Sequence, residues 1–376
     1  MKLSKQILLK NSRRIVVKAG SNVLTGSDGN LSPRRIENLV SQIAVLCSDH
    51  HKQVLLVSSG AVAAGMGKLG IKTRPQSLPD IQALAAVGQS LLIEIYRSVF
   101  NKRGIEIGQV LVTKEDFQNR NRFLNISNTF SALLRQKIVP VINENDTVAT
   151  HEITFGDNDQ LCALVSHAVH ADLAILLTSE DGLLDFDNQG LVIPQVEKID
   201  KKILSKISES KTALGVGGMK SKLQAISQLV GNGTPVILAN GKQDFVVTDF
   251  LEGKEHGTLF HPSVSRLKRK KAWIAYLGKP QGEVQVDAGA CQALVSKNSS
   301  LLAIGIKEVS GHFPKGALVR ILHEKKEVGR GLANYSADEI RQVKGLKSSE
   351  LSKILGNILY EEVIHKDNLV VQDLQT

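Results

Sequence analysis

Residues 139–146 read Val-Pro-Val-Ile-Asn-Glu-Asn-Asp, an apolar run that changes abruptly to amide and carboxylate side chains. The run predicts a buried strand at residues 138–142 that ends in a polar cluster. Other short β-branched runs alternate with longer helical patterns between residues 15 and 239. This alternation predicts an α/β fold built on a largely parallel sheet.

Six strands and five helices make up the expected first domain. The strands are predicted at residues 15–17, 54–57, 105–112, 138–142, 173–178 and 235–239. The helices are predicted from residue 33 toward residue 50 and at residues 80–102, 122–137, 160–170 and 222–230. Ser32 followed by Pro33 is typical of a helix N-cap with proline in the first turn, so that helix has a defined start.

The composition changes after residues 257–262, which indicates a second domain. A basic run, residues 266–271, comes next, and strand-like segments then continue to about Val371. They are predicted at residues 282–287, 301–306, 317–321 and 329–333. We therefore expect a first domain at residues 1–265, a basic linker at 266–271 and a small β-rich domain at 272–376. A length of 376 residues favours such a division.

The charge distribution bears on possible nucleic-acid partners. Five of the ten excess positive charges lie in the run 266–271, whereas residues 272–376 carry 13 basic against 12 acidic side chains. A solvated basic hinge is therefore the favoured interpretation. A binding surface for RNA or an acidic partner is the alternative.

Targeting and membrane signals are not evident in the sequence. The apolar run near the start, residues 7–9, is too short for a secretory signal, and no stretch approaches about 18 uninterrupted apolar residues. The three cysteines are scattered without metal-ligand spacing. We expect a cytoplasmic protein that does not cross a membrane.

The ends of the predicted strands carry the residues suited to ligand binding, because ligands of parallel sheets bind beyond the carboxyl ends of the strands. These ends are Lys18-Ala19-Gly20-Ser21, Ser58-Ser59-Gly60-Ala61, Asn143-Glu144-Asn145-Asp146 and Thr178-Ser179-Glu180-Asp181-Gly182. Small residues let backbone N–H groups approach an anion, and Lys18 adds a positive charge there. Each segment alone could be an ordinary turn.

The strongest local signal is a glycine-rich segment that ends in lysine and opens a helix. It reads Gly215-Val216-Gly217-Gly218-Met219-Lys220-Ser221-Lys222. Its free N–H groups and the helix dipole favour a phosphate, and Lys222 could reach the transferred phosphoryl group. The Walker A spacing is absent, so a P-loop NTPase is not indicated. A flexible surface loop is the alternative interpretation.

A second unusual segment, residues 155–160, contains Asp157, Asn158 and Asp159 just before a predicted helix. A helix N-cap is the simple explanation, because Asp and Asn favour that position. Together with the polar cluster at 143–146, however, the segment exceeds what capping requires. The pair suits a ligand that carries both an ammonium group and carboxylates.

In order and spacing, these segments resemble the amino acid kinase superfamily and, within it, the family of bacterial glutamate 5-kinases. The matching motifs are Lys18-x-Gly-Ser and residues 58–65, 85–89, 139–146, 156–159 and 217–222. Residues 272–376 resemble a PUA domain. The resemblance implies a sandwich with a mainly parallel central sheet covered by helices on both sides, followed by a PUA-like domain.

The resemblance also implies residue roles. Lys18 and Lys222 are expected to neutralise the phosphoryl group, with Asp159 organising them. Ser59, Asp146 and Asn158 are expected to bind the amino acid. Besides Lys18, the ATP-binding residues are expected to be Thr178, Ser179, Val216, Gly217, Gly218, Met219, Lys220, Ser221 and Lys222. Ser179 and Leu184 depart from the family pattern, where an aspartate and an aromatic residue are common.

The implied activity is ATP-dependent phosphorylation of the γ-carboxylate of L-glutamate to γ-glutamyl phosphate, the first step of proline biosynthesis. Mg²⁺ is the expected cofactor beside ATP, although no dedicated ligand cluster is evident. Proline as a feedback inhibitor and a homo-oligomer are also expected. The alternatives are a kinase of another small acid, such as aspartate or acetylglutamate, and an RNA-binding protein acting through the PUA-like domain.

Overall fold

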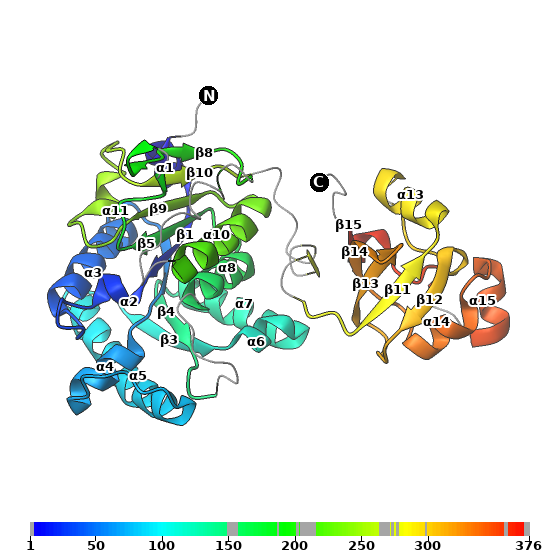
Figure 1. Ribbon diagram of the computed structural model, residues 1–376, viewed down its shortest axis with the longest axis horizontal. Coiled ribbons are helices and arrows are strands. Elements are labelled where there is room, and N and C mark those ends of the chain that lie inside the picture. The colour runs from blue at the N-terminus through cyan, green and yellow to red at the C-terminus, as the bar shows by residue number, and fades with distance from the viewer. Residues whose placement is uncertain are drawn as a thin grey trace. The chain divides into compact units, whose positions relative to one another are not determined.

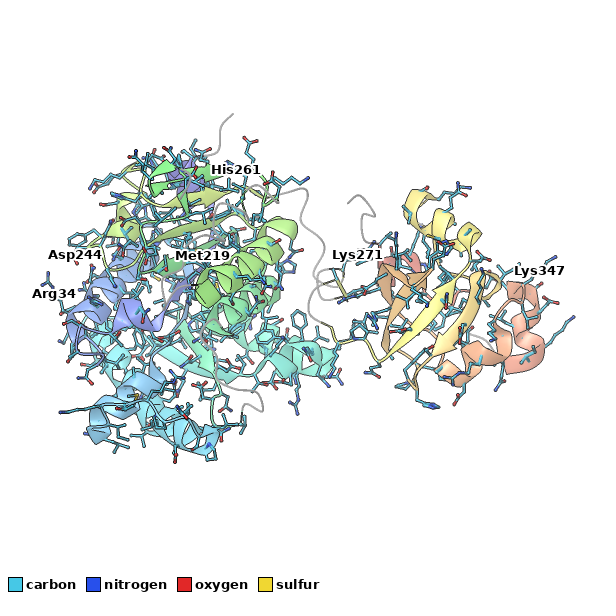
Figure 2. All side chains as sticks on the ribbon, viewed as in Figure 1. Arg34, Met219, Asp244, His261, Lys271 and Lys347 are labelled. Carbon is cyan, nitrogen blue, oxygen red and sulfur yellow. The ribbon has the colours of Figure 1, made fainter. Side chains whose placement is uncertain are left out.

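The computed structural model describes residues 4–148, 157–185, 188–200, 203, 216–262, 271, 274–275, 278–297, 299–356 and 360–371. The chain divides into two compact units. The first comprises Met1–Asp116 and Asn121–Arg266, and the second comprises Phe117–Arg120 and Leu267–Thr376 (Figure 1). Each unit has its own hydrophobic core. Of the expected linker at 266–271, only Lys271 is described (Figure 2).

The first unit is built on an eight-stranded sheet of order β3-β4-β2-β1-β5-β9-β10-β8. The strands are β1 Arg14–Ala19, β2 Gln53–Val57, β3 Ile107–Val112, β4 Val139–Glu144, β5 Leu173–Thr178, β8 Gln195–Val196, β9 Val236–Asn240 and β10 Thr258–Phe260. The six strands from β3 to β9 run parallel, whereas β10 runs antiparallel to β9. The predicted α/β fold with a mainly parallel sheet is confirmed, and all six predicted strands are present.

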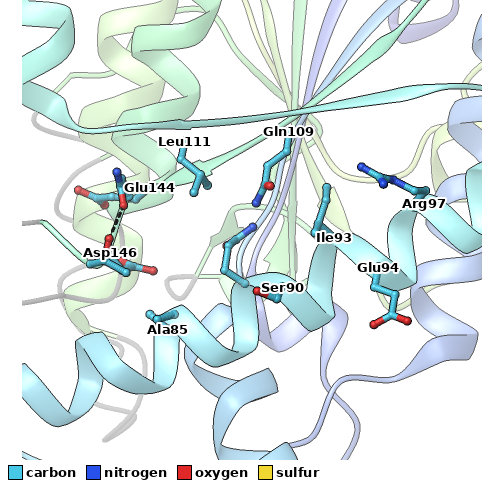
Figure 3. Close-up of a pocket in the computed structure, with 13 residues that line it drawn as sticks. Ala85, Ser90, Ile93, Glu94, Arg97, Gln109, Leu111, Glu144 and Asp146 are labelled. Atoms are coloured by element: carbon cyan, nitrogen blue, oxygen red, sulfur yellow. Dashed lines mark hydrogen bonds between the residues drawn. The ribbon is translucent and has the colours of Figure 1, made fainter.

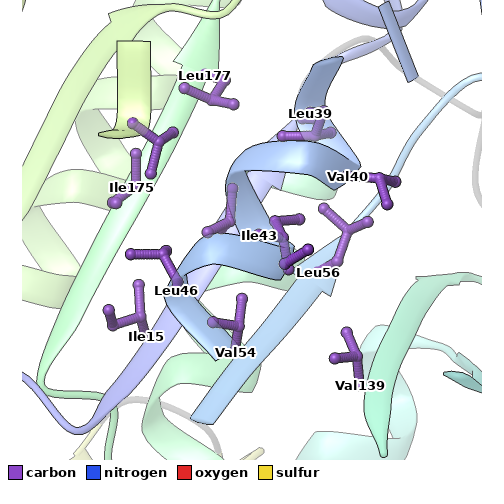
Figure 4. Packing of buried hydrophobic residues seen from close by; sticks show 14 of the residues in the cluster. Ile15, Leu39, Val40, Ile43, Leu46, Val54, Leu56, Val139, Ile175 and Leu177 are labelled. Carbon is purple, nitrogen blue, oxygen red and sulfur yellow. The ribbon is translucent and has the colours of Figure 1, made fainter. Parts of the chain in front are cut away.

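Helices cover both faces of this sheet. The helices are α1 Lys5–Asn11, α2 Ser21–Leu24, α3 Pro33–Ser48, α4 Ala61–Leu69, α5 Leu78–Asn101, α6 Lys114–Gln118, α7 Arg120–Arg135, α8 Asp157–Val169, α10 Val216–Gly231 and α11 Val246–Asp249. Ile43 and Leu46 of α3 pack against strand residues such as Ile15 and Val54 on one face (Figure 4). On the other face α8 and α10 lie side by side (Figure 1). The predicted sandwich is therefore present.

Helix α10 begins earlier than the sequence suggests. The prediction started the helix at Lys222, on the assumption that Gly217 and Gly218 precede it, but the helix begins at Val216. A helical glycine costs only about 1 kcal/mol relative to alanine. Burial of Leu223 and Ile226 offsets that cost. The glycine-rich residues are thus the first turn of α10 rather than a loop before it.

Two glycines let α4 and α5 pack in close contact. A Cβ atom on Gly88 would lie 1.8 Å from the carbonyl oxygen of Ala61, and one on Gly65 would lie 2.1 Å from that of Leu84. Both glycines occur in the motifs that resemble amino acid kinases. Their role here is packing, and it places α5 beside the carboxyl edge of the sheet.

Helix α5 is the one described helix that is long and apolar enough to cross a membrane. A core helix can meet the same criteria. The side chains of Leu92, Tyr96 and Phe100 are buried in the core of the first unit, whereas Glu94 and Arg97 are exposed. These contacts identify α5 as an amphipathic core helix.

The second unit contains a five-stranded sheet of order β12-β11-β13-β14-β15. Its elements are β11 Gly282–Val286, α13 Ala288–Lys297, β12 Ile306–Ser310, β13 Leu318–His323, β14 Lys326–Leu332, α14 Ala337–Val343, α15 Ser348–Leu355 and β15 Leu369–Val371. All pairings are antiparallel except that of β11 with β13. The predicted β-rich domain is confirmed.

One predicted strand in this unit, at residues 301–306, is wrong. Leu301 forms an isolated bridge to Ile364, and Ala303–Gly305 forms a 3₁₀ turn. A Cβ atom on Gly305 would lie 2.4 Å from the Cβ of Ala290 in α13. The chain therefore bends closely past α13, and β12 starts only at Ile306.

Replacing Gly88 by alanine is expected to destabilise the first unit. The added methyl would overlap backbone atoms of α4, so the two helices must separate, at a cost of about 1–3 kcal/mol or more. Thermal unfolding followed by circular dichroism measures the effect. Gly289→Ala is the control, because its nearest neighbour is 3.5 Å away. Equal transition temperatures for Gly88→Ala and the wild type would contradict this account of the packing.

Candidate active site

The strand order brings the predicted site residues to one edge of the sheet. Asn143 lies near the end of β4, Ser59 follows β2, Lys18 lies near the end of β1, and Thr178 ends β5. These four strands are neighbours in that spatial order. Because adjacent strands are about 4.8 Å apart, the positions after β2 and β5 lie about 10 Å apart, with Lys18 between them.

A buried carboxylate bound to two lysines occupies the middle of this edge. Asp159, in the first turn of α8, is fully buried. One of its oxygens lies 2.7 Å from Lys18 Nζ, and the other lies 3.1 Å from Lys222 Nζ. The structure thus brings together the three residues expected to be catalytic. Two ammonium groups against one carboxylate leave a net positive charge that suits an anion.

Gly20 leaves room for the Lys18 ammonium group. A Cβ atom at Gly20 would lie 3.2 Å from Lys18 Nζ. The Lys18 side chain is nearly buried, whereas the Lys222 side chain is 17% exposed. Lys222 is therefore the lysine of the pair that is more open to solvent.

A chain of amide side chains lies on the β4 side of the lysines. Asn158 Nδ2 donates to Ser59 Oγ at 2.7 Å and to Asn143 Oδ1 at 3.3 Å. Asn143 Nδ2 in turn donates to Gln89 Oε1 at 2.7 Å. The Oδ1 atom of Asn158 is buried and has no hydrogen-bond partner in the described part of the chain. It can accept a hydrogen bond from a ligand, and Ser59 and Asn158 meet as predicted.

Helix α5 also contacts the backbone next to this series of amide side chains, through Tyr96. Tyr96, seven residues after Gln89 on the same side of the helix, lies 2.9 Å from Ser58 through the two hydroxyl groups. Burial raises the pKa of Tyr96, and the Ser58 hydrogen bond opposes that shift. The tyrosine stays a neutral hydroxyl and fixes the backbone just before Ser59.

A pocket of about 510 Å³ opens beside these residues (Figure 3). It is lined by Ala85, Ala86, Gln89, Ser90, Ile93, Glu94, Arg97, Gln109, Leu111, Glu144, Asn145, Asp146 and Thr147. Asp146 and Glu144 form one wall, and α5 forms another (Figure 3). Asp146 therefore shares a pocket with Gln89, which bonds the amide network of Ser59 and Asn158.

The segments predicted to bind the nucleotide lie on the β5 side of Lys18. Ser179 Oγ donates weakly to Glu180 at 3.4 Å. The first turn of α10 holds the predicted residues 216–219, of which Met219 is labelled in Figure 2. The N–H groups of a first helical turn have no partner within the helix and can bind phosphate oxygens. Gly156 and Gly215 of the predicted motifs lie outside the described residues.

The part of the chain that the structure describes contains no group of three or more His, Cys, Asp or Glu side chains that could hold a metal ion.

Comparison with known proteins settles the family. A model described as "Amino acid kinase family" matches residues 13–240. The chain belongs to the amino acid kinase family. Kinase membership implies the use of ATP. A second model, described as "PUA domain", matches residues 282–355, so the expected C-terminal PUA-like domain is confirmed.

Curated relatives share nearly the full length of the chain. One from Caldanaerobacter subterraneus subsp. tengcongensis is 46% identical over 363 residues, covering 95% of this chain and 97% of the relative. Another, from Syntrophus aciditrophicus, is 44% identical over 376 residues, covering 99% and 97%. Both are named "Glutamate 5-kinase". The predicted resemblance to this branch of the amino acid kinase family is confirmed.

Three residues of this candidate site had no individual role in the sequence-based prediction. Gln89 and Asn143 stood inside quoted motifs, but a motif does not say which side chains bond each other. Tyr96 offered no signal, because an aromatic residue on an amphipathic helix is usually only a core residue. Its hydroxyl role depends on where α5 crosses β2, which periodicity does not determine.

Removing the Asp159 carboxylate is expected to destabilise the fold strongly. In Asp159→Ala the ammonium groups of Lys18 and Lys222 lose their shared partner, so the free energy of unfolding should fall by about 3 kcal/mol or more. Urea unfolding measures this change. The control is Asp338→Ala, which removes an exposed partner of Arg341 and should change stability by less than about 1 kcal/mol. Equal effects of the two substitutions would contradict a buried role for Asp159.

Proposed function

We propose that this protein transfers the γ-phosphoryl group of ATP to the γ-carboxylate of L-glutamate, giving γ-glutamyl phosphate. The observation that carries the proposal is the Lys18–Asp159–Lys222 cluster, which joins β1, α8 and α10 and lies beside the hydrogen bonds of the neighbouring Asn158. The curated relatives named glutamate 5-kinase support the choice of acceptor. The product is an acyl phosphate that the next step toward proline would consume.

The amino acid would bind on the β4 side of the lysines. The buried Oδ1 of Asn158 and the carboxylate of Asp146 are acceptors suited to an α-ammonium group. Ser59 is held by Asn158 and can contact the amino acid from the β2 side. A substrate anchored there would direct its side-chain carboxylate toward Lys18.

The chemistry requires positioning and charge neutralisation rather than a general base. A carboxylate is already ionised and nucleophilic at neutral pH. Lys18 and Lys222 would stabilise the charge that spreads over the transferred phosphoryl oxygens. Asp159 bonds both lysines and so orients their ammonium groups, which makes it a positioning residue for the two that touch the phosphoryl group.

The nucleotide would lie across the ends of β5 and α10. Thr178, Ser179 and residues 216–221 are proposed to contact it, with the α10 N–H groups facing its phosphates. We propose that Mg²⁺ arrives bound to the ATP phosphates, since the described protein residues offer no cluster for it.

The site assigns the catalytic work to the first domain, proposed as residues 1–265. Lys18, Ser59, Asp146, Asp159 and Lys222 all lie there. Proline shares the α-amino acid group of glutamate, and we propose that it competes for the same pocket. The homo-oligomer implied by the family resemblance stays a prediction.

Glutamate-dependent ADP release tests the proposed reaction. With Mg-ATP, purified protein should release ADP far faster with L-glutamate than with aspartate or acetylglutamate, because the relatives act by name on glutamate. A coupled assay across the three acids measures the rates. Equal rates with aspartate would overturn the substrate assignment, and no release with any acid would overturn the reaction.

Two substitutions should separate binding from chemistry. Asp146→Ala should chiefly raise the KM for glutamate, because Asp146 is proposed to hold the substrate ammonium group. Asp159→Asn should chiefly lower kcat, by about 100-fold, because the lysines lose their charged anchor. Steady-state kinetics at saturating ATP measures both constants. The reverse pattern would exchange the two proposed roles.

A further inference from the structure

A buried hydrogen bond joins the far ends of the two helices that carry Asp159 and Lys222. His167, near the end of α8, lies 2.7 Å from Asn232, which directly follows α10. The contact joins His167 Nδ1 to the Asn232 amide, and both side chains are buried. The phosphoryl-transfer machinery does not use either residue. The pair is a second polar contact between these helices, beside the ion pair of Asp159 and Lys222.

The histidine in this pair is neutral. Burial and, to a smaller extent, the nearby charge of His170 lower the pKa of His167 to about 4. A neutral ring has one nitrogen that donates and one that accepts, so it can bond the asparagine amide without a buried charge. The contact is therefore kept at neutral pH.

The two helices are tied at both ends. Helix α8 links the parallel strands β4 and β5, and α10 leads into the parallel strand β9, so both helices run opposite to the strands. Asp159 and Lys222 join them at the sheet edge that forms the site. His167 and Asn232 join them at the opposite end, about 12 Å along α8 from Asp159.

An apolar interface alone fixes helix register poorly. The buried apolar side chains of the two helices include Leu161, Val165, Ile226 and Leu229, and apolar burial is non-directional, so it discriminates weakly between registers. A single buried polar pair is different, because each partner loses its hydrogen bond when the register shifts. Buried polar residues specify register in coiled coils for the same reason.

We propose that the His167–Asn232 hydrogen bond sets the register of α10 against α8 and thereby the position of Lys222 relative to Asp159. His167 and Asn232 are positioning residues that act through Lys222. For its kinetic consequence the inference rests on the proposed kinase reaction. The geometric consequence, a fixed Lys222 ammonium group, does not depend on the substrate.

The test compares the kcat of two variants, each of which loses one buried polar contact. Asn232→Leu removes the bond to His167, whereas Gln42→Leu removes an equally buried bond from Val247 N–H that joins α3 to α11. Asn232→Leu should lower kcat about tenfold or more with little change in the KM for glutamate, since a displacement of about 1 Å can cost 100-fold. Gln42→Leu should lower stability without changing kcat. Asn232→Asp, which can accept from His167 Nδ1–H, should retain most of the turnover.

A second measurement is independent of the substrate. Acetylation of Lys222 by an amine-reactive reagent, read by peptide mass spectrometry against exposed Lys326, should become several-fold faster in Asn232→Leu and stay unchanged in Gln42→Leu. An Asn232→Leu variant that is less stable than the wild type, but has the wild-type kcat and the wild-type rate of Lys222 acetylation, would overturn the proposal. If that variant does not fold, Asn232→Ala takes its place with the same criteria. If the wild type has no kinase activity but Lys222 is acetylated faster in Asn232→Leu, the proposed reaction is contradicted and the positioning role of the His167–Asn232 pair is not.

Discussion

The ion pairs of Asp159 are the constraint on which the first unit depends. A fully buried carboxylate is costly to remove from water unless charged partners surround it, and here both oxygens face lysines. Those lysines come from β1 and α10, while Asp159 comes from α8. Three elements that are distant in sequence must therefore meet at one point. The same charges that make this arrangement stable leave the excess positive charge that a phosphoryl group requires.

The strand order turns this cluster into a site with two sides. Because β2 and β4 lie on one side of β1 and β5 lies on the other, the polar residues after β2 and β4 and the end of β5 lie on opposite sides of Lys18. Lys18 stands at the strand between them. The proposed transfer between two bound molecules would need such a placement on either side of the lysine.

The sequence predicts the sheet well because parallel strands are continuous apolar runs with polar ends. All six parallel strands follow from that pattern, whereas the meeting of Lys18, Asp159 and Lys222 is expected only from the resemblance to the amino acid kinase superfamily. The start of α10 is not predictable from local preference, since tertiary burial of Leu223 and Ile226 overrides the cost of Gly217 and Gly218. The support of Ser58 by Tyr96 also escapes prediction, because it depends on the crossing of α5 over the sheet. The strand-like apolar run at 301–306 misleads because the close contact of Gly305 with α13, which bends the chain there, is a tertiary feature.

Packing and chemistry are joined in α5. The close approach at Gly65 and Gly88 places this helix so that Gln89, the next residue, reaches Asn143 and Tyr96 reaches Ser58. A larger residue at position 88 would move the helix away from α4 and carry both polar side chains with it. The amide chain would then lose its outer anchor, although none of its own members had changed. The motif at residues 85–89 therefore acts on the substrate pocket through a backbone contact as well as through a side chain.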